Sequence, residues 1–445
     1  MQTTGVDPGQ IGRIFRAESG RAVAAAPGRP GRRQVGKSRL VQEFCNTADV
    51  PYLFFTATQG AAPPEALASL LRELRESSLP VNAELVPETS PTNWPDMFRV
   101  LAAALPPAPS IVVLDELPWL AEQDARFDGA LQTGWDRLLA TRPVLLLLLG
   151  SDLHMMERLT AYDRPFFGRA DNLVLGPLNP AETASALALP PAEAIDAHLI
   201  CGGLPGIVRS WPTGMPPLAF LERECSDPAA PVFGVPEASV LTEFPGPDLT
   251  RRVLEAVGSG DRTQANIAAS AANRQGPLPS GALSPLLHRL TEEKRALAVD
   301  TPLSIRPGRP ALYRVSDSNL RLYLAALRSA QELSRRGRTA AAFELLRRRW
   351  PSWRGRAVEP VIRESLELAA AAGALPWPDV GAVGGWWNRR FDPEIDLVGA
   401  DRGPVARRID FVGSVKWLSS PVDRHDLAAL SKGLLAIPGV EPDRV

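Results

Sequence analysis

One eight-residue segment constrains the fold of this chain more than any other. Residues 31–38 read Gly-Arg-Arg-Gln-Val-Gly-Lys-Ser and fit the pattern G-x-x-x-x-G-K-[ST] in full. The glycines of this pattern let the backbone curl, so that successive N–H groups point inward at phosphate oxygens. Leu40, Val41 and Phe44 follow at helical spacing, which predicts a helix whose N-terminus favours anions. A chance glycine-rich turn is the alternative, and an eight-residue match with a helix behind it favours nucleotide binding.

A second segment has the pattern of a buried strand that ends in two carboxylates. It is Ser110-Ile-Val-Val-Leu-Asp-Glu-Leu117, and an apolar run of this length suits a strand buried on both faces of a parallel sheet. Ligands bind beyond the carboxyl ends of such strands, where Asp115 and Glu116 fall. We expect Asp115 to hold Mg²⁺ and Glu116 to orient or deprotonate the water that attacks the γ-phosphate. A plain strand end is the alternative for this segment taken alone.

These patterns define a candidate site for ATP and Mg²⁺. Lys37 is expected to reach the β- and γ-phosphates, and the Ser38 hydroxyl to ligate Mg²⁺. The strand Val144–Leu149 ends in Gly150-Ser151, which places a hydroxyl beside the γ-phosphate or is a simple strand exit. The predicted catalytic residues are Glu116 and Lys37, and the predicted metal ligands are Ser38 and Asp115. The predicted nucleotide-binding residues are Gly31, Arg32, Arg33, Gln34, Val35, Gly36, Lys37, Ser38, Arg39 and Ser151.

Composition excludes several other classes of protein. The net charge of −1 gives no global reason to expect nucleic acid or an anionic membrane. The three cysteines fit neither a disulfide framework nor a zinc site, and none of the four histidines is paired at metal spacing. The most apolar run, Val144–Leu149, is too short to span a bilayer, and the N-terminus has no signal pattern. We therefore expect a cytoplasmic protein without a membrane partner. The sequence leaves open whether the protein forms an oligomer.

The order of the predicted elements indicates an α/β fold of several domains. Strand-like and helix-like runs alternate over 1–190, which predicts a three-layer P-loop NTPase domain. A helical lid is expected over 191–245 and a winged helix over 246–320, with three helices and a hairpin around the turn at 307–310. Arginine-rich helices and a small α/β nuclease-like domain are expected over 321–445.

Local charge suggests a nucleic-acid partner, with an alternative. Residues 321–356 hold ten arginines against two glutamates, a local excess of +8. A solvated helix face explains such a run equally well. For the winged helix, the expected partner is double-stranded DNA, contacted through the helix over 284–294 and the turn near Arg306 and Arg309.

With these motifs in hand, the chain resembles the archaeal-type P-loop ATPases of the AAA+/STAND-like group, which carry a winged helix and a C-terminal PD-(D/E)XK nuclease-like domain of unknown function. The resemblance covers nearly the whole chain. Its marks are Ile11-Gly-Arg13, the loop at 31–38, Leu114-Asp-Glu116, Gly150-Ser151, Phe167-Gly-Arg169, Gly202-Gly-Leu-Pro205, Tyr313-Arg-Val-Ser-Asp317, Glu394-Ile-Asp396 and Val415-Lys-Trp417. It implies that residues 11–13 lie near the adenine and that a lid begins at 202–205. Two roles stay open for Arg169: an arginine finger that acts in trans, or a helix cap.

The chain departs from this family pattern in two places. The segment before the loop, residues 21–30, is poor in β-branched residues and contains Pro27 and Pro30, so we expect it to form a central strand with difficulty. In the C-terminal part, Glu359, Asp396 and Lys416 match the nuclease pattern, but Ser414 stands where a glutamate is expected. A neutral hydroxyl is a poor ligand for a divalent cation beside one carboxylate, which argues against nuclease activity.

Three functions follow from these residues. The first is a slow Mg²⁺-dependent ATPase that acts as a switch or motor. The second is a nucleic-acid-binding regulator in which the ATPase is regulatory. The third, an active nuclease, is disfavoured by Ser414.

Overall fold

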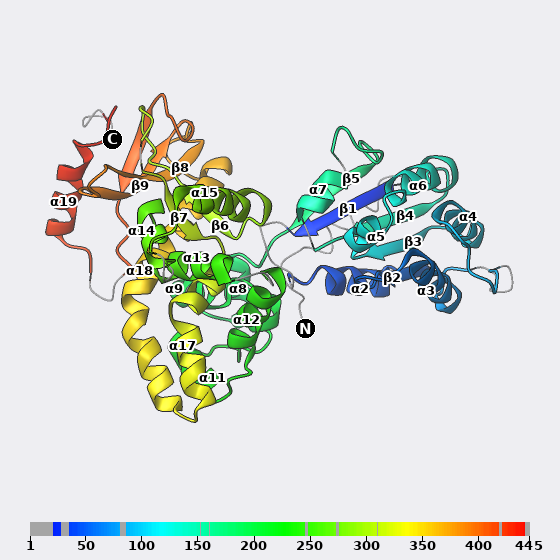
Figure 1. Cartoon of the computed structure of the whole chain (residues 1–445). Coiled ribbons are helices and arrows are strands. Elements are labelled where there is room, and N and C mark those ends of the chain that lie inside the picture. Colours follow the sequence, from blue (N-terminus) through cyan, green and yellow to red (C-terminus); the bar gives the residue numbers. More distant parts are fainter. Residues whose placement is uncertain are drawn as a thin grey trace. The chain divides into compact units, whose positions relative to one another are not determined.

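The structure is a computed structural model (Figure 1). It describes residues 21–27, 35–80, 86–151, 153–159, 161–244, 248–272, 276–308, 310–417 and 421–440. The chain divides into two compact units. The first comprises Met1–Asn179 with Leu204–Gly206, and the second comprises Pro180–Gly203 with Ile207–Val445. Residues 11–13 and 31–34, which the sequence assigns to the nucleotide site, lie outside the described residues.

The first unit is built on a five-stranded sheet in which every neighbouring pair is parallel. The strand order is β2-β3-β4-β1-β5. The strands are β1 (Arg21–Pro27), β2 (Tyr52–Thr56), β3 (Ser110–Asp115), β4 (Val144–Leu149) and β5 (Ala170–Leu175). The helices between them are α2 (Lys37–Thr47), α3 (Pro63–Glu76), α4 (Trp94–Ala104), α5 (Leu117–Gln123), α6 (Phe127–Gly134) with η2 (Trp135–Leu139), and α7 (Leu153–Leu159).

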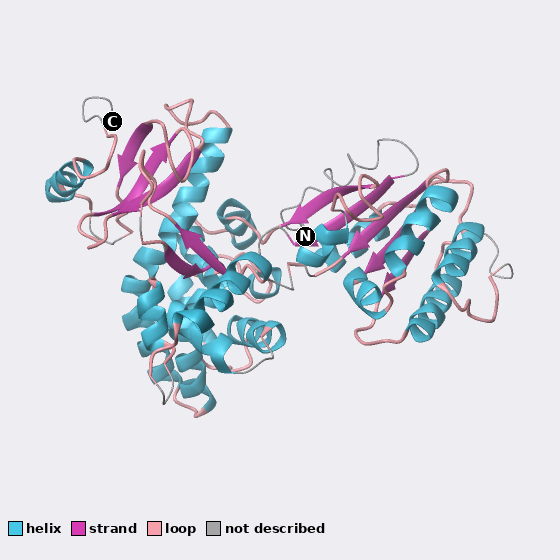
Figure 2. Ribbon diagram, turned by 45° about the horizontal axis from the view of Figure 1, so that its top comes forward, coloured by secondary structure: helices cyan, strands magenta, loops and turns pink. Residues whose placement is uncertain are grey.

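Helices cover both faces of this sheet, and alternate residues of one strand serve the two faces. Val112 and Leu114 of β3 pack in a large core with α3, α4, α5 and α6. Ile111 and Val113 of the same strand pack on the other side with Val41 of α2. Figure 2 shows this sheet among its helices. The predicted α/β fold class with a three-layer first domain is confirmed.

The expectation that residues 21–30 form a central strand with difficulty is wrong for the part that the structure describes. β1 is a strand over Arg21–Pro27, with β4 on one side and β5 on the other. The ladder to β4 ends at Ala25, which pairs with Leu149, and only the ladder to β5 runs on to Pro27. Proline is tolerated here because it is the last residue of the strand, where the ladder on one side has already ended.

The second unit begins with helices and contains two small sheets. Its first helices are α8 (Pro180–Leu187), α9 (Pro191–Cys201), α10 (Pro205–Val208, which starts in the first unit), α11 (Pro217–Glu224) and α12 (Pro231–Glu243). Next come α13 (Asp248–Ser259), α14 (Gln264–Ser270), α15 (Ser280–His288) with η3 (Arg289–Glu293), β6 (Leu297–Asp300) and β7 (Leu312–Val315). The two strands pair antiparallel. These elements lie close to the predicted ones, and their identification as a winged helix stays a prediction.

The rest of the second unit combines long helices with a three-stranded antiparallel sheet. The helices are α16 (Ser318–Leu322) with η4 (Tyr323–Leu327), α17 (Arg328–Arg335) and α18 (Thr339–Ala371). The sheet has the order β10-β9-β8, with β8 (Ala382–Trp387), β9 (Glu394–Ala400) and β10 (Ile409–Gly413), and α19 (Arg424–Leu434) follows it. Among the described residues, no helix is long and apolar enough to cross a membrane.

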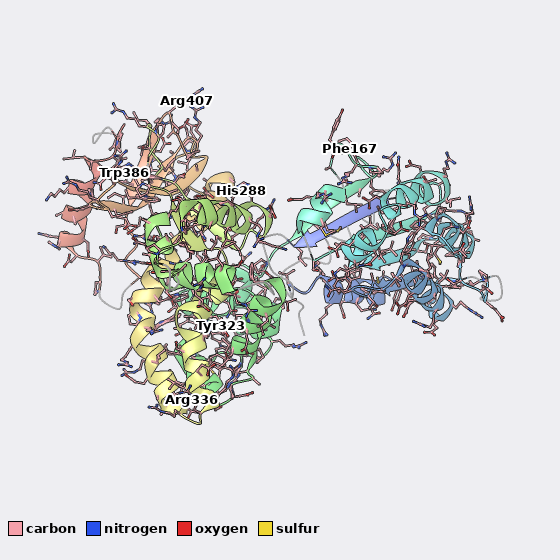
Figure 3. All side chains as sticks on the ribbon, in the orientation of Figure 1. Phe167, His288, Tyr323, Arg336, Trp386 and Arg407 are labelled. Atoms are coloured by element: carbon pink, nitrogen blue, oxygen red, sulfur yellow. The ribbon has the colours of Figure 1, made fainter. Side chains whose placement is uncertain are left out.

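The loop between β6 and β7 packs on this C-terminal sheet. Leu303 is buried with Trp386 and Ile395, and its N–H donates to the carbonyl of Gly385 at 2.8 Å. The Trp387 indole donates to the carbonyl of Pro310 at 2.7 Å. Figure 3 labels Trp386 on the sheet. The loop between β6 and β7 and the C-terminal sheet therefore share one core.

Candidate functional site

The described half of the predicted phosphate loop leads directly into α2. Gly36 caps this helix with φ 88° and ψ 16°, a left-handed conformation that glycine adopts without steric cost. A Cβ at Gly36 would lie 3.6 Å from the ring of Pro205. Lys37 is the first residue of the helix and is 7% exposed. The N–H groups of the first turn and the lysine charge make this end of α2 suited to a phosphate group.

Asp115 ends β3 next to Lys37 and Ser38. Burial raises the pKa of Asp115, while a hydrogen bond with the Ser38 side chain and the charge of Lys37 lower it. The structure thus brings together the hydroxyl and the carboxylate that the sequence assigns to Mg²⁺. Oxygen ligands of this kind are the ones that Mg²⁺ takes in proteins, often one or two from the protein and the rest from phosphate and water. Ser38 and Asp115 fit that ligand set.

Glu116 and Ser151 form a pair across the ends of two neighbouring strands. Glu116 follows β3, and its backbone has φ 54° and ψ 42°, a left-handed conformation that costs a non-glycine residue on the order of 1 kcal/mol. Its N–H donates to Asp115 Oδ1 at 3.0 Å. The Ser151 hydroxyl, two residues beyond β4, donates to Glu116 Oε2 at 2.6 Å. The strained turn therefore places the carboxylate of Glu116 against Ser151 at the carboxyl edge of the sheet.

Gly150 allows α5 and α7 to meet behind this pair. A Cβ at Gly150 would lie 2.5 Å from Met156 Sδ and 2.9 Å from Pro118 Cδ. The ring of Pro118 is rigid, so we expect Gly150→Ala to lower the free energy of unfolding by about 1–3 kcal/mol. We also expect a slower ATP hydrolysis, because Ser151 is the next residue. Urea unfolding of the full chain measures the stability.

Gly129 provides the matched control for Gly150. It lies in α6 of the same unit, and a Cβ there would meet nothing within 4 Å. Gly129→Ala should raise the free energy of unfolding by about 0.5–1 kcal/mol, as expected for glycine to alanine inside a helix. Equal effects of the two substitutions would show that the space around Gly150 does not matter.

Arg169 holds a loop in place within the first unit. Its guanidinium donates to both carboxylate oxygens of Asp136, at 2.7 and 2.8 Å, and to the carbonyls of Pro165 and Phe167 at 2.9 and 3.0 Å. These bonds tie residues 165–169 to η2. A guanidinium with four such bonds serves local structure in this chain, and the two roles that the sequence left open stay untested.

The C-terminal residues of the nuclease pattern also come together, without a metal site. Ser414 Oγ donates to Asp396 Oδ2 at 2.8 Å, and the N–H of Val415 donates to the same oxygen at 2.8 Å. Glu359 on α18 is bound by Arg363 at 3.3 Å. Within the described residues, no group of three or more histidine, cysteine or acidic side chains is placed to hold a metal. Both donors take the same oxygen of Asp396, the one carboxylate that β9 contributes to the nuclease pattern.

Glu359 makes stability depend on pH. Burial raises its pKa to about 7 from the ordinary 4.5, against the lowering effect of Arg363, and the charge of Asp396 adds to the rise. Between these two values the folded chain binds a proton that the unfolded chain has released, so the free energy of unfolding falls as pH rises. Glu359→Gln should remove this component, up to about 3 kcal/mol between pH 4.5 and 7. Urea unfolding at several pH values compares parent and variant; identical pH dependence would mean that folded Glu359 is ionised throughout.

Most arginines of the 321–356 segment have partners in the folded chain. Five of them form ion pairs: Arg328 with Glu255, Arg335 with Glu237, Arg347 and Arg348 with Glu344, and Arg354 with Asp196. Arg349 donates to the carbonyl of Ala325, and Arg321 to that of Arg356. Arg336 lies exposed at the turn between α17 and α18 (Figure 3). The local charge is largely balanced by acidic side chains, so this segment alone does not indicate a nucleic-acid surface.

The sequence also predicted two arginines at the turn between β6 and β7 as DNA contacts. Arg306 is exposed, and Arg309 lies outside the described residues.

Sequence reasoning missed several residues around the site. It assigned no strand to β5, no helix to α5 or α7, and no role to Asp128, Arg158 and Arg164, which line a cavity between α5 and α7. β5 contains Asp171 and Asn172, which have low strand propensity, so only its pairing with β1 reveals it. The hydrophobic positions Leu117 and Leu120 were the available signal for α5.

No protein-family model and no curated protein matches the chain. Among solved structures it is similar to a Walker-type ATPase of Pyrococcus abyssi, with a TM-score of 0.48 and 17% identity over 71% of this chain and 94% of that chain. It is also similar to the ORC2 protein of Aeropyrum pernix in ADPNP-ADP complexes, with a TM-score of 0.44 and 14% identity over 75% and 94%. Drosophila ORC bound to DNA gives a TM-score of 0.32 and 16% identity over 72% and 94%. The assignment of the site rests on the residues of this chain.

Proposed function

We propose that the chain binds ATP with Mg²⁺ and hydrolyses it slowly, as a molecular switch or motor. The observation that supports this most is the meeting of Lys37, Ser38 and Asp115 at the carboxyl edge of a parallel sheet, next to the Glu116–Ser151 pair. A lysine charge, an oxygen ligand pair and a general base are the groups that phosphoryl transfer to water needs.

Each residue has one task in this proposal. The N–H groups at the start of α2 and the Lys37 ammonium bind the phosphate oxygens. Ser38 and Asp115 would hold Mg²⁺, which neutralises charge on the phosphates when bound. Glu116 accepts a proton from the attacking water, and the Ser151 hydroxyl orients the carboxylate of Glu116. The test is phosphate release from ATP by the full chain, expected with Mg²⁺ and absent with a chelator.

Duplex DNA remains a candidate partner for residues 248–316. We infer it from the order of three helices and an antiparallel hairpin, and Arg306 on the hairpin loop is exposed. Titration of a labelled duplex at two salt concentrations tests it, because binding through phosphate contacts weakens steeply with salt. An absence of binding at low salt, with and without ATP, would make these residues a protein-docking element.

We infer further that the C-terminal part does not cleave nucleic acid. The hydrogen bonds of Ser414 and Val415 to Asp396 support this, because a neutral donor lies beside the carboxylate where a second carboxylate would help to hold a metal. Plasmid incubated with the full chain and Mg²⁺ should stay intact, whereas Ser414→Glu supplies the missing carboxylate and is the variant in which cleavage could arise. Degradation by the parent chain that is lost in Lys416→Ala would contradict the inference.

A further inference from the structure

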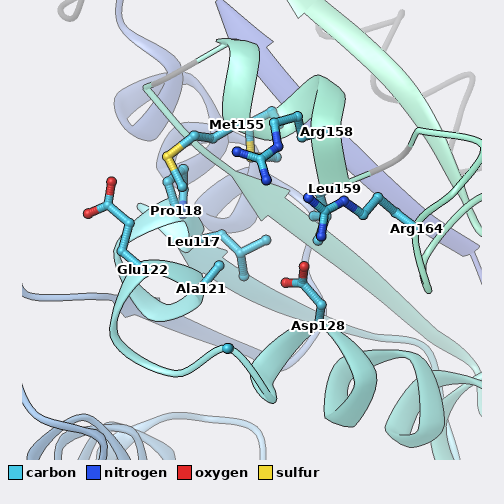
Figure 4. A pocket seen from close by; sticks show the side chains of 11 residues that line it. Leu117, Pro118, Ala121, Glu122, Asp128, Met155, Arg158, Leu159 and Arg164 are labelled. Atoms are coloured by element: carbon cyan, nitrogen blue, oxygen red, sulfur yellow. The ribbon is translucent and has the colours of Figure 1, made fainter.

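A cavity lies between α5 and α7, the helices that follow Glu116 and Ser151. Its volume is about 310 Å³, and its lining comes from α5, α6, α7 and the loop after α7. Apolar side chains, among them Leu117, Met155 and Leu159, form part of the wall, and four side chains contribute charges: Glu122, Asp128, Arg158 and Arg164 (Figure 4). A concave apolar site of this size with a few convergent polar groups is typical of small-molecule binding.

The charged groups of the cavity act on one another, but one of them has a buried oxygen with no hydrogen-bond partner among the described residues. Asp128 Oδ1 is buried and has no hydrogen-bond partner there. Figure 4 shows the Asp128 carboxylate pointing toward Arg164. Burial raises the pKa of Asp128, and the charges of Arg164 and Arg158 oppose this rise. In the same part of the chain, neither guanidinium donates a hydrogen bond or forms an ion pair within 4 Å. A buried carboxylate oxygen without a donor is costly, so the cavity is suited to a ligand that brings both a donor and an acceptor.

We propose that this cavity binds a small zwitterion with an apolar body, specifically an α-amino acid with an apolar side chain. Its ammonium group donates to Asp128, and its carboxylate accepts from Arg158 and Arg164. The apolar side chain packs on Leu117 and Met156. Both charges of the ligand are therefore needed, and so are both signs of charge in the protein.

The position of the cavity couples its occupancy to the candidate catalytic pair, a consequence that rests on the proposed function. α5 starts one residue after Glu116, and α7 starts two residues after Ser151. A Cβ at Gly150 would contact side chains of both helices, Pro118 of α5 and Met156 of α7. A ligand that binds this conformation favours it, and in it the Ser151 hydroxyl holds the carboxylate of Glu116. An occupied cavity should therefore change the rate of ATP hydrolysis.

Calorimetry on the full chain tests the binding site directly. L-leucine, L-methionine and L-phenylalanine are titrated, and at least one is expected to bind with a dissociation constant on the order of 0.1 mM. N-acetyl-L-leucine lacks the cation and L-leucinamide lacks the carboxylate, and each should bind at least about tenfold more weakly than L-leucine. Binding of all three leucine compounds with equal affinity, or no binding of any amino acid at millimolar concentration, would overturn the proposal.

Variants separate this site from other causes of binding. Asp128→Asn and Arg158→Gln should each weaken amino-acid binding at least about tenfold. Arg126→Gln is the control, because Arg126 lies two residues from Asp128 and is 89% exposed in a pair with Asp124. Thermal melts verify that each variant is folded. The Lys37→Ala variant should still bind the amino acid. The two proposals can therefore fail separately, because amino-acid binding does not require the nucleotide site. A folded Asp128→Asn variant with parent affinity would contradict the assignment.

Discussion

Glu116→Gln is expected to lower kcat for ATP hydrolysis by about 100-fold or more, while the dissociation constant for ATP changes little. Glutamine has the size of glutamate and can still accept the hydrogen bond that Ser151 donates at 2.6 Å. It cannot take a proton from water, so the loss falls on the chemical step. Steady-state phosphate release gives kcat, and calorimetry gives the affinity.

The control for this substitution is Glu43→Gln. Glu43 is exposed on α2 of the same unit, so the variant changes the same charge away from the candidate site. It should hydrolyse ATP at the parent rate. A Glu116→Gln variant that also keeps the parent rate would show that Glu116 is not the base, and the assignment of the Asp-Glu strand end would fail.

Lys37→Ala should weaken ATP binding by about 100-fold or more, since a buried ammonium next to phosphate contributes several kcal/mol. Lys37 is the loop residue that combines burial, a place at the start of α2 and proximity to Asp115. Calorimetry with ATP and Mg²⁺ measures the change. Lys37→Met, which keeps the length of the side chain, distinguishes loss of charge from loss of packing.

Arg72→Gln provides the comparison for the lysine variants. Arg72 is exposed on α3, and its guanidinium donates a hydrogen bond to the hydroxyl of Ser69 on the same helix. Its loss should leave ATP affinity unchanged. Parent affinity in both Lys37 variants, with thermal melts that show them folded, would remove the lysine from the nucleotide site.

Sequence patterns predicted the structure correctly wherever one short segment contains all the residues on which the prediction depends. The strand Val144–Leu149 has the predicted bounds, because a run of six apolar residues suits a strand that is buried on both faces of the sheet. Asp115 and Glu116 fall at the edge of the sheet as predicted, since a polar pair after an apolar run marks the end of the strand. For the described part of the loop, glycine before Lys37 correctly indicated the start of a helix.

Features that depend on distant contacts were not predictable in this way. The strand over residues 21–27 is stabilised by ladders to β4 and β5, which compensate for its alanine-rich sequence. The left-handed backbone of Glu116 has no local sequence signal, because glycine or asparagine would be expected there. The cavity with Asp128 and Arg158 forms only when α5, α6 and α7 come together.

The most direct test of the account is a calorimetric titration of the unaltered full chain with ATP, with Mg²⁺ and then with a chelator. Ser38 and Asp115 adjoin each other beside Lys37, so we predict one ATP bound per chain and a clear loss of affinity when Mg²⁺ is removed. No heat of binding in the presence of Mg²⁺, or an affinity that the chelator leaves unchanged, would contradict the proposed nucleotide site.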